Sequence, residues 1–550
     1  MKKILALLLA LSMVFALCAC GTTEETPAVD ESAADEAVVD ESADDEVVVD
    51  KSAAGEVAAE ESGFQRLTEE GTLTVGITST NDSFDPCTSF FIPGMTLVYD
   101  QLLRMDEDGN IVGELAEEFE YQDTTHIYFK LHEATFSNGD PVTSEDVLWT
   151  LERYVLTSSS WADSVSFIDF DNCEIINDRE FVLASTEEFG PGLSYLATRI
   201  SYILNKDYVE SVDDEAMWDQ PCGSGPYVCT SNVSGSLATF ELREDYWDAD
   251  NIPEAREITI RCYSEATTMF IDYENGVLDM AFLLGESDAE RLLNGEVADT
   301  NYKIQSGLDV YGFAMPEYVD AFDDLRVRQA IAMAVDWEAV TEIGMGVLGS
   351  VADSIVPNGV LYHKSVGTYE YDPEGAKALL DEAGFDYSQV FSLVVVNSES
   401  NARLAEAIQA YLAVVGIQME VETCDLATAI TRFMFCQTDF VINSMGSCTT
   451  LDPDSMFSTI GPWSQNGTVS ITSGEMAEDM GLYLTTGRYS VDPEVREEAY
   501  ANAQEWMYTY IRQVAFAEPY YCYCYRPYIS TDFWTASVEQ PNLRLVEFVD

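Results

Sequence analysis

Strand-like and helix-like patterns alternate along most of this chain, and that alternation limits its fold more than any other feature. Residues 392–396 form a short apolar run typical of a buried strand, residues 403–415 have the pattern of a helix, and residues 418–422 alternate like a second strand. A helix between two strands allows the strands to run parallel. Because strands and helices are interleaved rather than segregated, we predict an α/β fold.

Capping signals indicate where several helices begin. Thr143 and Asp146 form a weak capping box, in which each side chain accepts a hydrogen bond from the other's backbone N–H. Asp372 and Pro373 suit the N-cap and the first helical position, and Gly384 ends the same helix. The other predicted elements are strands at residues 72–77, 126–131, 238–242 and 257–261, and helices that begin at Asp324 and Asp492.

The chain is strongly acidic. It contains 26 Lys and Arg against 99 Asp and Glu, which gives a formal net charge of −73. Nucleic-acid binding depends on Lys and Arg at phosphates, so this balance excludes nucleic acid as a partner and argues against binding to anionic lipid headgroups. At 550 residues, the chain exceeds what a single hydrophobic core usually supports, and we expect two or three lobes.

The first twenty residues have the pattern of an export signal. Lys2 and Lys3 precede an apolar run at residues 4–17, which is too short for a comfortable transmembrane helix. The run ends in Leu-Cys-Ala-Cys-Gly, which resembles a bacterial lipoprotein box with Cys20 as the lipidated first mature residue. The alternative is an ordinary signal peptide with incidental cysteines. We expect an extracytoplasmic protein, anchored by lipid to the outer face of the cytoplasmic membrane, in the periplasmic space or at the cell surface.

Residues 21–62 are low in complexity. A motif of Asp, Glu or Lys, Ser and Ala begins at Asp30, Asp40 and Asp50, and Lys51 is the only base in this stretch. Such a composition cannot bury enough apolar surface to offset its ordering entropy. We therefore predict a disordered acidic linker. An adhesive acidic tail is the alternative.

The cysteines and histidines give no sign of a metal or cofactor site. Of the 12 cysteines, two lie in the leader, and the others form no C-x-x-C or finger-like spacing. Cys522 and Cys524 would share one face of a strand. Disulfides are possible in an exported chain, but we expect mostly free, buried thiols. With three histidines in the chain, we expect no cofactor, no metal site, and neither nickel nor haem as the main cargo.

Several motifs occur in an order that resembles a known family. The chain is similar to extracytoplasmic solute-binding protein family 5, the peptide-, nickel- and opine-binding proteins of ABC importers, from about residue 71 to its end. Most of these motif residues have scaffold roles: Gly223 and Gly225, for example, suit tight backbone geometry. The motifs that carry the resemblance are residues 114–116 with 128–131, 136–147, 223–227, 246–247, 275–279, 327–336 and 371–384.

The resemblance implies a two-lobed fold of the periplasmic-binding-protein type, type II, in the large class with an extra subdomain and a ligand cleft between the lobes. The C-terminal segment would return to the first lobe. The expected organisation is a lipoprotein signal at 1–20, a linker at 21–62, lobe 1 at 63–107 with 217–305 and 516–550, a subdomain inserted in lobe 1 at 108–216, and lobe 2 at 306–515.

The same resemblance implies a receptor that captures peptides or peptide-like small molecules and delivers them to an ABC permease in the membrane. We expect a monomer. We do not expect an enzyme, because His126, His132 and His363 form no His-x-x-x-His or visible nucleophile–base arrangement. The alternatives are a surface lipoprotein with a chaperone-like or sensory role and, less favoured, a hydrolase.

Family members contact ligand through three segments, which can be carried over by position. For each residue, a role in the core or in a turn is an equal alternative. Family members that bind oligopeptides often carry a Trp and an acid before the aspartate–proline, but here Thr449 stands near the acid's position, which puts amine recognition there in doubt. The expected contacts are Phe84, Asp85, Ser89, Phe90, Tyr227, Met445, Gly446, Ser447, Thr449 and Asp452.

These segments contain aromatic rings and small hydroxyl groups but no nearby Arg or Lys. Apolar walls with a few convergent polar groups are typical of small-molecule sites. We therefore predict a short, neutral or cationic, partly apolar peptide-like ligand, and weak binding of a free acidic dipeptide.

Overall fold

The computed structural model describes residues 71–89, 91–106, 108–157, 159, 161–212, 218–444, 448–457, 474–530 and 542–549. These residues belong to one compact unit, Lys51–Asp550. The predicted leader, the linker and Cys20 lie outside the described residues. Within the described ranges, no helix combines the length and the apolar character needed to cross a membrane.

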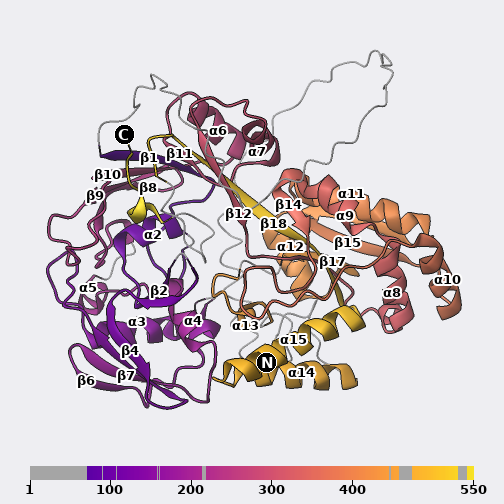
Figure 1. Cartoon of the computed structure of the whole chain (residues 1–550), viewed down its shortest axis with the longest axis horizontal. Helices are drawn as coiled ribbons and strands as arrows, with labels where there is room; N and C mark the ends of the chain where they lie inside the picture. Colours follow the sequence, from indigo (N-terminus) through magenta and orange to yellow (C-terminus); the bar gives the residue numbers. More distant parts are fainter. Residues whose placement is uncertain are drawn as a thin grey trace. The chain divides into compact units, whose positions relative to one another are not determined.

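A mixed sheet of twelve strands organises the chain (Figure 1). Its path is β16-β15-β17-β13-β18-β11-β1-β10-β9-β8, and β12 and β14 pair with β18 off this path. On one side of β18 (Gln513–Tyr525) lie β11 (Met280–Ala281), β1 (Thr72–Ile77), β10 (Glu257–Cys262), β9 (Leu237–Leu242) and β8 (Tyr227–Val233). On the other side lie β13 (Tyr311–Ala314), β17 (Phe440–Ser444), β15 (Val390–Val396) and β16 (Gln418–Cys424).

The long strand β18 belongs to both sides of this sheet. Its residues 520–525 pair with β12 (Asn301–Ser306), and its residues 513–517 pair with β13. Between these two stretches, β14 (Gly349–Val351) pairs with residues 517–519. The central part of β18 is therefore the place where the two sides of the sheet meet.

A separate four-stranded sheet has the order β4-β5-β7-β6. Its strands lie within the range predicted for the inserted subdomain, 108–216. They are β4 (Ala116–Tyr121), β5 (His126–Leu131), β6 (Glu174–Asn177) and β7 (Glu180–Ala184). A two-stranded sheet of β2 (Leu103–Met105) and β3 (Ile111–Gly113) precedes it in the chain.

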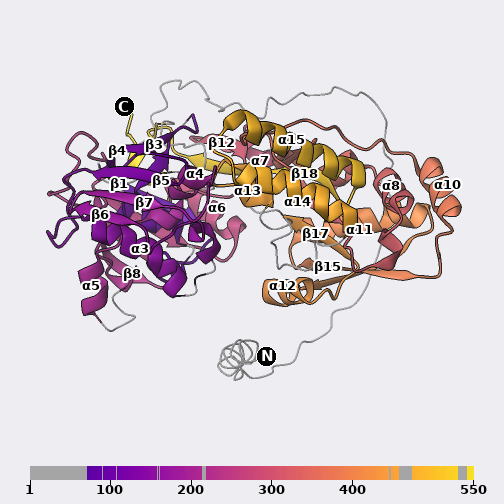
Figure 2. The ribbon, with the colours of Figure 1, turned by 90° about the horizontal axis from the view of Figure 1, so that it is seen from below.

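Helices and strands alternate along much of the chain, as the sequence predicts. Figure 2 shows α14 and α15 lying side by side. The helices are α2 (Ile92–Val98), α3 (Ser144–Leu156), α4 (Gly192–Leu196), α5 (Lys206–Ser211), α6 (Ala266–Glu274), α7 (Glu286–Leu293), α8 (Leu325–Ala334), α9 (Trp337–Met345), α10 (Pro373–Ala383), α11 (Glu399–Val414), α12 (Leu426–Met434), α13 (Pro453–Phe457), α14 (Gly474–Arg488) and α15 (Pro493–Tyr510).

The capping predictions are confirmed. Thr143 caps α3, and the reciprocal capping box with Asp146 is present. Asp372 accepts from the N–H of Gly375 at the start of α10, and Gly384 ends that helix at a φ of 71°. A β-carbon strains the backbone at such an angle, which explains why glycine stands there. The predicted strand–helix–strand unit is β15, α11 and β16, and its two strands are parallel.

Different hydrophobic clusters support the different parts of the chain. Val75 and Ile258 belong to the cluster under β1 and β10, whereas Phe313 and Phe440 belong to the cluster under β13 and β17. A third cluster joins Phe129 of the four-stranded sheet to residues of α13, α14 and α15. The four-stranded sheet therefore shares its core with helices that lie more than 300 residues later in the chain.

All ten cysteines from Cys87 to Cys524 are free thiols, as expected. The expectation that most of them are buried holds for half: Cys436 is exposed, and the other four are partly exposed. Cys522 and Cys524 lie in the same hydrophobic cluster, which confirms that they share one face of β18. Burial raises the pKa of the Cys522 thiol to about 12, so this group stays protonated and behaves as a small apolar side chain.

Candidate functional site

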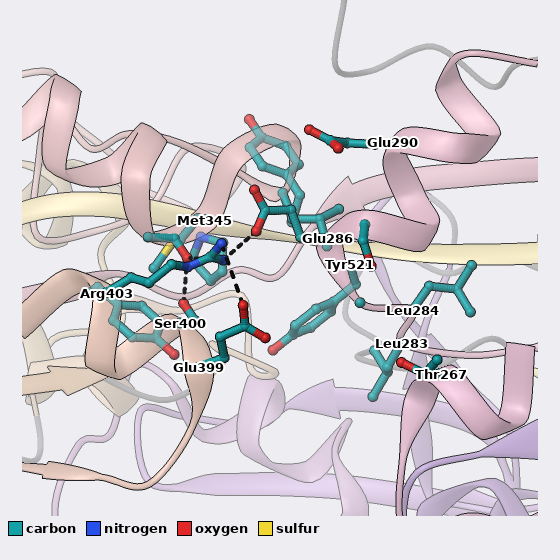
Figure 3. A pocket seen from close by; sticks show the side chains of 17 residues that line it. Thr267, Leu283, Leu284, Glu286, Glu290, Met345, Glu399, Ser400, Arg403 and Tyr521 are labelled. Carbon is teal, nitrogen blue, oxygen red and sulfur yellow. Dashed lines mark hydrogen bonds and ion pairs between the residues drawn. The ribbon is translucent and has the colours of Figure 1, made fainter. Parts of the chain in front are cut away.

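A cavity of about 590 Å³ lies beside the central part of β18 (Figure 3). Residues 519–521 of β18 form one wall. Residues 283–287 and Glu290, before and at the start of α7, come from one side of the strand together with Thr267 of α6, whereas the end of α9 and the start of α11 come from the other. The cavity is therefore lined by segments from both sides of the large sheet.

One ion pair crosses this cavity. Nη2 of Arg403, in α11, donates a hydrogen bond to Oε2 of Glu286, the first residue of α7. The same nitrogen donates to the carbonyl oxygen of Gly344 at 3.2 Å. Glu399, one turn earlier in α11, approaches Nη1 of Arg403 at 3.9 Å. The Arg403 and Glu286 side chains are 36% and 25% exposed, so solvent reaches both partners of the pair.

The local backbone positions both charged groups. Glu286 stands at the N-terminus of α7, where the helix dipole favours an acidic side chain. Gly346 lies directly beside this carboxylate: an added Cβ would stand 1.9 Å from Oε1 of Glu286. Ser400 donates to the Gly344 carbonyl oxygen at 2.8 Å, which ties the start of α11 to the end of α9.

The remaining walls are aromatic and apolar. Tyr311, Tyr520 and Tyr521 contribute rings, and Ser350 donates to the hydroxyl oxygen of Tyr520 at 3.2 Å. Leu283, Leu284, Met345 and Leu348 add apolar surface. The charged side chains in the lining are Glu286, Glu290, Glu399 and Arg403, a formal sum of −2. Apolar walls with a few convergent polar groups, in a cavity of this size, are suited to holding a small molecule.

The structure places two of the predicted aromatic contacts in the core. Phe84 is fully buried and packs edge-to-face against Phe91 and Phe240. Tyr227 is 1% exposed, and its hydroxyl donates to the carbonyl oxygen of Ala255 at 2.7 Å. Neither residue lines the cavity. For both, the structure favours the alternative of a core role.

Asp85 and Ser89 make internal contacts instead of lining the cavity. Both carboxylate oxygens of Asp85 accept from Arg153, at 2.7 and 2.8 Å. The Ser89 hydroxyl donates to Asp82 at 3.0 Å and accepts from the N–H of Phe91. These contacts fix the turn after β1.

Asp452 is fully buried, and both its oxygens accept from Nη2 of Arg496, at 2.9 and 2.8 Å. Thr449 is partly exposed in the turn before it. Neither residue lines the cavity. Phe90, Met445, Gly446 and Ser447 lie outside the described residues, and their roles stay predictions.

Sequence reasoning missed the residues that do line the cavity. It found no Arg or Lys near the expected contacts, whereas Arg403 lies in the cavity wall. One signal could have found it: Arg403 lies in the helix that follows β15, and open α/β sheets bind ligands beyond the carboxyl ends of their strands. Glu286 gives no such signal, because it is 117 residues away from Arg403 in sequence.

No group of three or more His, Cys, Asp and Glu is arranged to hold a metal ion in the part of the chain that the structure covers. Glu518, next to the cavity wall in β18, is 5% exposed, and its Oε1 accepts from the N–H of Asn358 at 3.1 Å. Burial raises the pKa of Glu518 to about 7. This carboxyl therefore titrates near neutral pH at the meeting point of the two sides of the sheet.

Comparison with known proteins identifies related sequences. Residues 110–468 match the family described as bacterial extracellular solute-binding proteins, family 5. A Brucella ovis protein, whose name provisionally assigns it to peptide binding for an ABC transporter, is 27% identical over 351 residues. That match covers 60% of this chain and 63% of the relative's length.

Solved structures show the same fold at low sequence identity. A dipeptide-binding protein from Pseudoalteromonas, in complex with Met-Leu, has a TM-score of 0.74 at 20% identity, over 87% of this chain and 100% of that one. NikA from Brucella suis, in complex with Fe(III)-EDTA, has a TM-score of 0.77 at 19% identity, over 87% and 99%. The predicted α/β fold of the periplasmic-binding-protein type is confirmed.

Proposed function

The chain belongs to family 5 of the bacterial extracellular solute-binding proteins, and from this premise we propose that it is the solute receptor of an ABC import system. It captures a peptide or peptide-like small molecule outside the cytoplasmic membrane and delivers it to a permease. The chain matches 63% of the length of the Brucella ovis relative. The support for the proposal is therefore this chain's own cavity. The observation that carries the proposal is the position of that cavity against β18, between segments from both sides of the sheet.

That position suits a receptor that closes on its ligand. A small molecule in the cavity would touch α6, α7 and β18 on one side and α9 and α11 on the other. Binding energy would then favour the arrangement in which both sides contact the ligand, as in hinge closure. A permease can distinguish loaded from empty receptor by such a difference.

The proposed ligand is short, neutral or cationic and partly apolar. The tyrosine and leucine walls favour apolar groups, and the formal charge of −2 in the lining disfavours an added anion. Solved relatives with peptides include the Met-Leu complex from Pseudoalteromonas and a Haemophilus influenzae protein in complex with the peptide RPPGFSPFR. The proposal includes Phe90 and the segment Met445–Ser447 as further contacts.

The proposal extends to the anchor and the partners. Lipidation at Cys20 would hold the protein at the outer face of the membrane beside its permease, where it would act as a monomer and without catalysis. Replacing Cys20 with Ser tests the anchor by cell fractionation. Normal processing and membrane retention of the Cys20→Ser protein would contradict it.

Small-angle X-ray scattering with a mixed peptide pool, followed by mass spectrometry of the released ligand, tests the receptor function. We expect the protein to contract and to release the peptide unchanged. Thr267→Trp, in the cavity wall, should abolish the contraction, whereas Thr268→Trp, exposed on the same helix but outside the lining, should preserve it. Cleaved peptide would favour a hydrolase, and no retained ligand would contradict the proposal.

A further inference from the structure

Among the described residues that line the cavity, a single charged side chain is basic, and it already has an acidic partner. This side chain is Arg403, and Glu286 accepts a hydrogen bond from its Nη2 across the cavity. Two more carboxylates, Glu290 and Glu399, face the same space. A ligand carboxylate that approached Arg403 would therefore meet a guanidinium that Glu286 already occupies.

The pair is held from both ends by the backbone. Gly346 leaves room for the Glu286 carboxylate, because a Cβ there would lie 1.9 Å from Oε1. The Gly344 carbonyl oxygen accepts from Nη2 of Arg403 at 3.2 Å and so orients the guanidinium. The guanidinium is therefore oriented by a backbone acceptor before any ligand arrives. A ligand anion would have to displace an acid that the fold has positioned beforehand.

We propose that Glu286 is a specificity-determining residue: it occupies Arg403 and makes the cavity reject ligands that present a free carboxylate there. This inference rests on the proposed function and makes its ligand more specific. The favoured ligand is a peptide-like molecule whose carboxyl group is blocked, absent or directed away from Arg403. Discrimination of this kind works by repulsion of the wrong ligand rather than by added attraction for the right one.

The chemistry of the Glu286→Gln variant gives the inference a clear test. Glutamine keeps the size of the side chain and can still accept one hydrogen bond, but the negative charge is lost. Nη2 of Arg403 then faces the open cavity without a carboxylate partner, still oriented by Gly344, and the longer contact of Nη1 with Glu399 at 3.9 Å is the ion pair that remains. A free carboxylate can pair with this guanidinium in a charge-assisted hydrogen bond. The substitution should therefore reverse the preference between carboxylate and amide.

The experiment uses the full chain and an equimolar library of Ala-X-Phe tripeptides, made both as C-terminal acids and as C-terminal amides. After equilibration and gel filtration, mass spectrometry gives the ratio of acid to amide among the retained peptides. Wild type should retain amides over acids. Glu286→Gln should raise the acid-to-amide ratio about tenfold, the change that one charge-assisted contact typically produces.

Glu290→Gln is the matched control. It makes the same change of charge on the same helix, but in the described structure Glu290 forms no ion pair with Arg403. This variant should change the ratio less than twofold. Thermal denaturation of all three proteins checks that each is folded at the temperature of the experiment.

The outcomes separate the inference from the proposed function. If peptides are retained but the ratio is the same in wild type and Glu286→Gln, the inference is wrong and the receptor function stands. A wild type that prefers acids, or a Glu290→Gln effect as large as that of Glu286→Gln, also overturns the inference. If folded wild type and variants retain no peptide, both the inference and the peptide-receptor proposal fail.

Discussion

Two ion pairs join parts of this chain that are distant in sequence, and their surroundings differ sharply. Arg496 and Asp452 are 6% and 0% exposed in their side chains, whereas Arg403 and Glu286 are 36% and 25% exposed and line a cavity. The first pair belongs to a sealed core, and the second pair faces open space. A buried pair with every oxygen bonded fixes structure, whereas a solvent-accessible pair in a cavity can respond to a ligand.

The buried contacts around Asp452 extend to the predicted inserted subdomain. Asp454, two residues after Asp452, accepts from the Tyr195 hydroxyl at 3.0 Å, and Tyr195 belongs to α4 in the predicted inserted subdomain. The N–H of Gly190 donates to the Arg488 carbonyl oxygen at 2.9 Å. Burial raises the pKa of Asp454. Here the predicted subdomain and the segment from α13 to α15 are joined by direct hydrogen bonds.

The largest expected effect comes from breaking the sealed pair. Arg496→Met leaves Asp452 buried without a counter-charge, and such a loss costs about 3–5 kcal/mol of unfolding free energy. Urea denaturation of the purified protein measures it. A loss below about 1 kcal/mol would mean that water reaches Asp452 and that the contrast between the two regions is wrong.

The next effect is a pH dependence of the free energy of unfolding, caused by Glu518 in β18. Its folded pKa, about 7, lies above the usual value of 4.5, so the folded protein holds a proton that the unfolded chain releases. Stability should fall as the pH rises from about 4.5 to about 7. Glu518→Gln should remove part of that fall and stabilise the protein at pH 8 by on the order of 1–3 kcal/mol.

Glu114 is buried beside Asp100, and burial raises its pKa to about 7 as well, so a pH dependence remains in the Glu518→Gln variant. The measurement is the urea midpoint of both proteins at intervals from pH 5 to pH 8. Parallel curves for wild type and Glu518→Gln would contradict the assignment of this titration to Glu518.

A smaller effect is expected when the space for Glu286 is removed. Gly346 has a φ of 49° and lies against the Glu286 carboxylate, whereas Gly295 has a φ of 68° with nothing near its missing Cβ. Gly346→Ala bears the larger backbone cost, about 1–3 kcal/mol against about 1 kcal/mol for Gly295→Ala, because its ψ of −128° lies in a region that glycine alone adopts readily. Displacement of the exposed pair with Arg403 should add about 0.5–1 kcal/mol, so Gly346→Ala should lose that much more stability in wild type than in a Glu286→Ala background. Equal losses in the two backgrounds, measured by urea denaturation, would contradict the contact between Gly346 and Glu286.

The smallest loss of stability is expected when the cavity pair itself is removed. Arg403→Met removes a partly exposed pair, so the loss of unfolding free energy should not exceed about 1 kcal/mol. The same substitution type at Arg496 should cost several times more, which makes the two variants controls for each other. If the Arg403→Met loss matches that of Arg496→Met, the cavity pair is a structural pair and not part of an open site.

The sequence predicted the fold better than the site, and particular residues explain why. Capping residues such as Thr143 and Asp372 act within one helical turn, so local sequence was enough to place α3 and α10. The family motifs mark backbone geometry: a Cβ on Gly225 would lie 2.7 Å from the carbonyl oxygen of Val98. Tyr227, the last residue of the same motif, fills the core, and so does Phe84 in the turn after β1.

The cavity could not be predicted in the same way. Its charged pair joins residues 117 positions apart, and nothing near Glu286 in the sequence indicates Arg403 as its partner. Only the pairing of β18 with strands from both sides brings α7 next to α11. The proposed charge of the ligand, neutral or cationic, could be predicted from the net charge of the chain, because a chain of net charge −73 offers few cations to an anionic ligand.

The central claim is that this chain holds a small peptide-like molecule in the cavity beside β18. Native mass spectrometry of the protein purified from its own host, without refolding, tests it most directly, with the Thr267→Trp variant purified in parallel. We predict one neutral or cationic peptide-like molecule bound to wild type and none bound to Thr267→Trp. An acidic peptide or a sugar on wild type, or the same ligand retained by Thr267→Trp, would contradict the account.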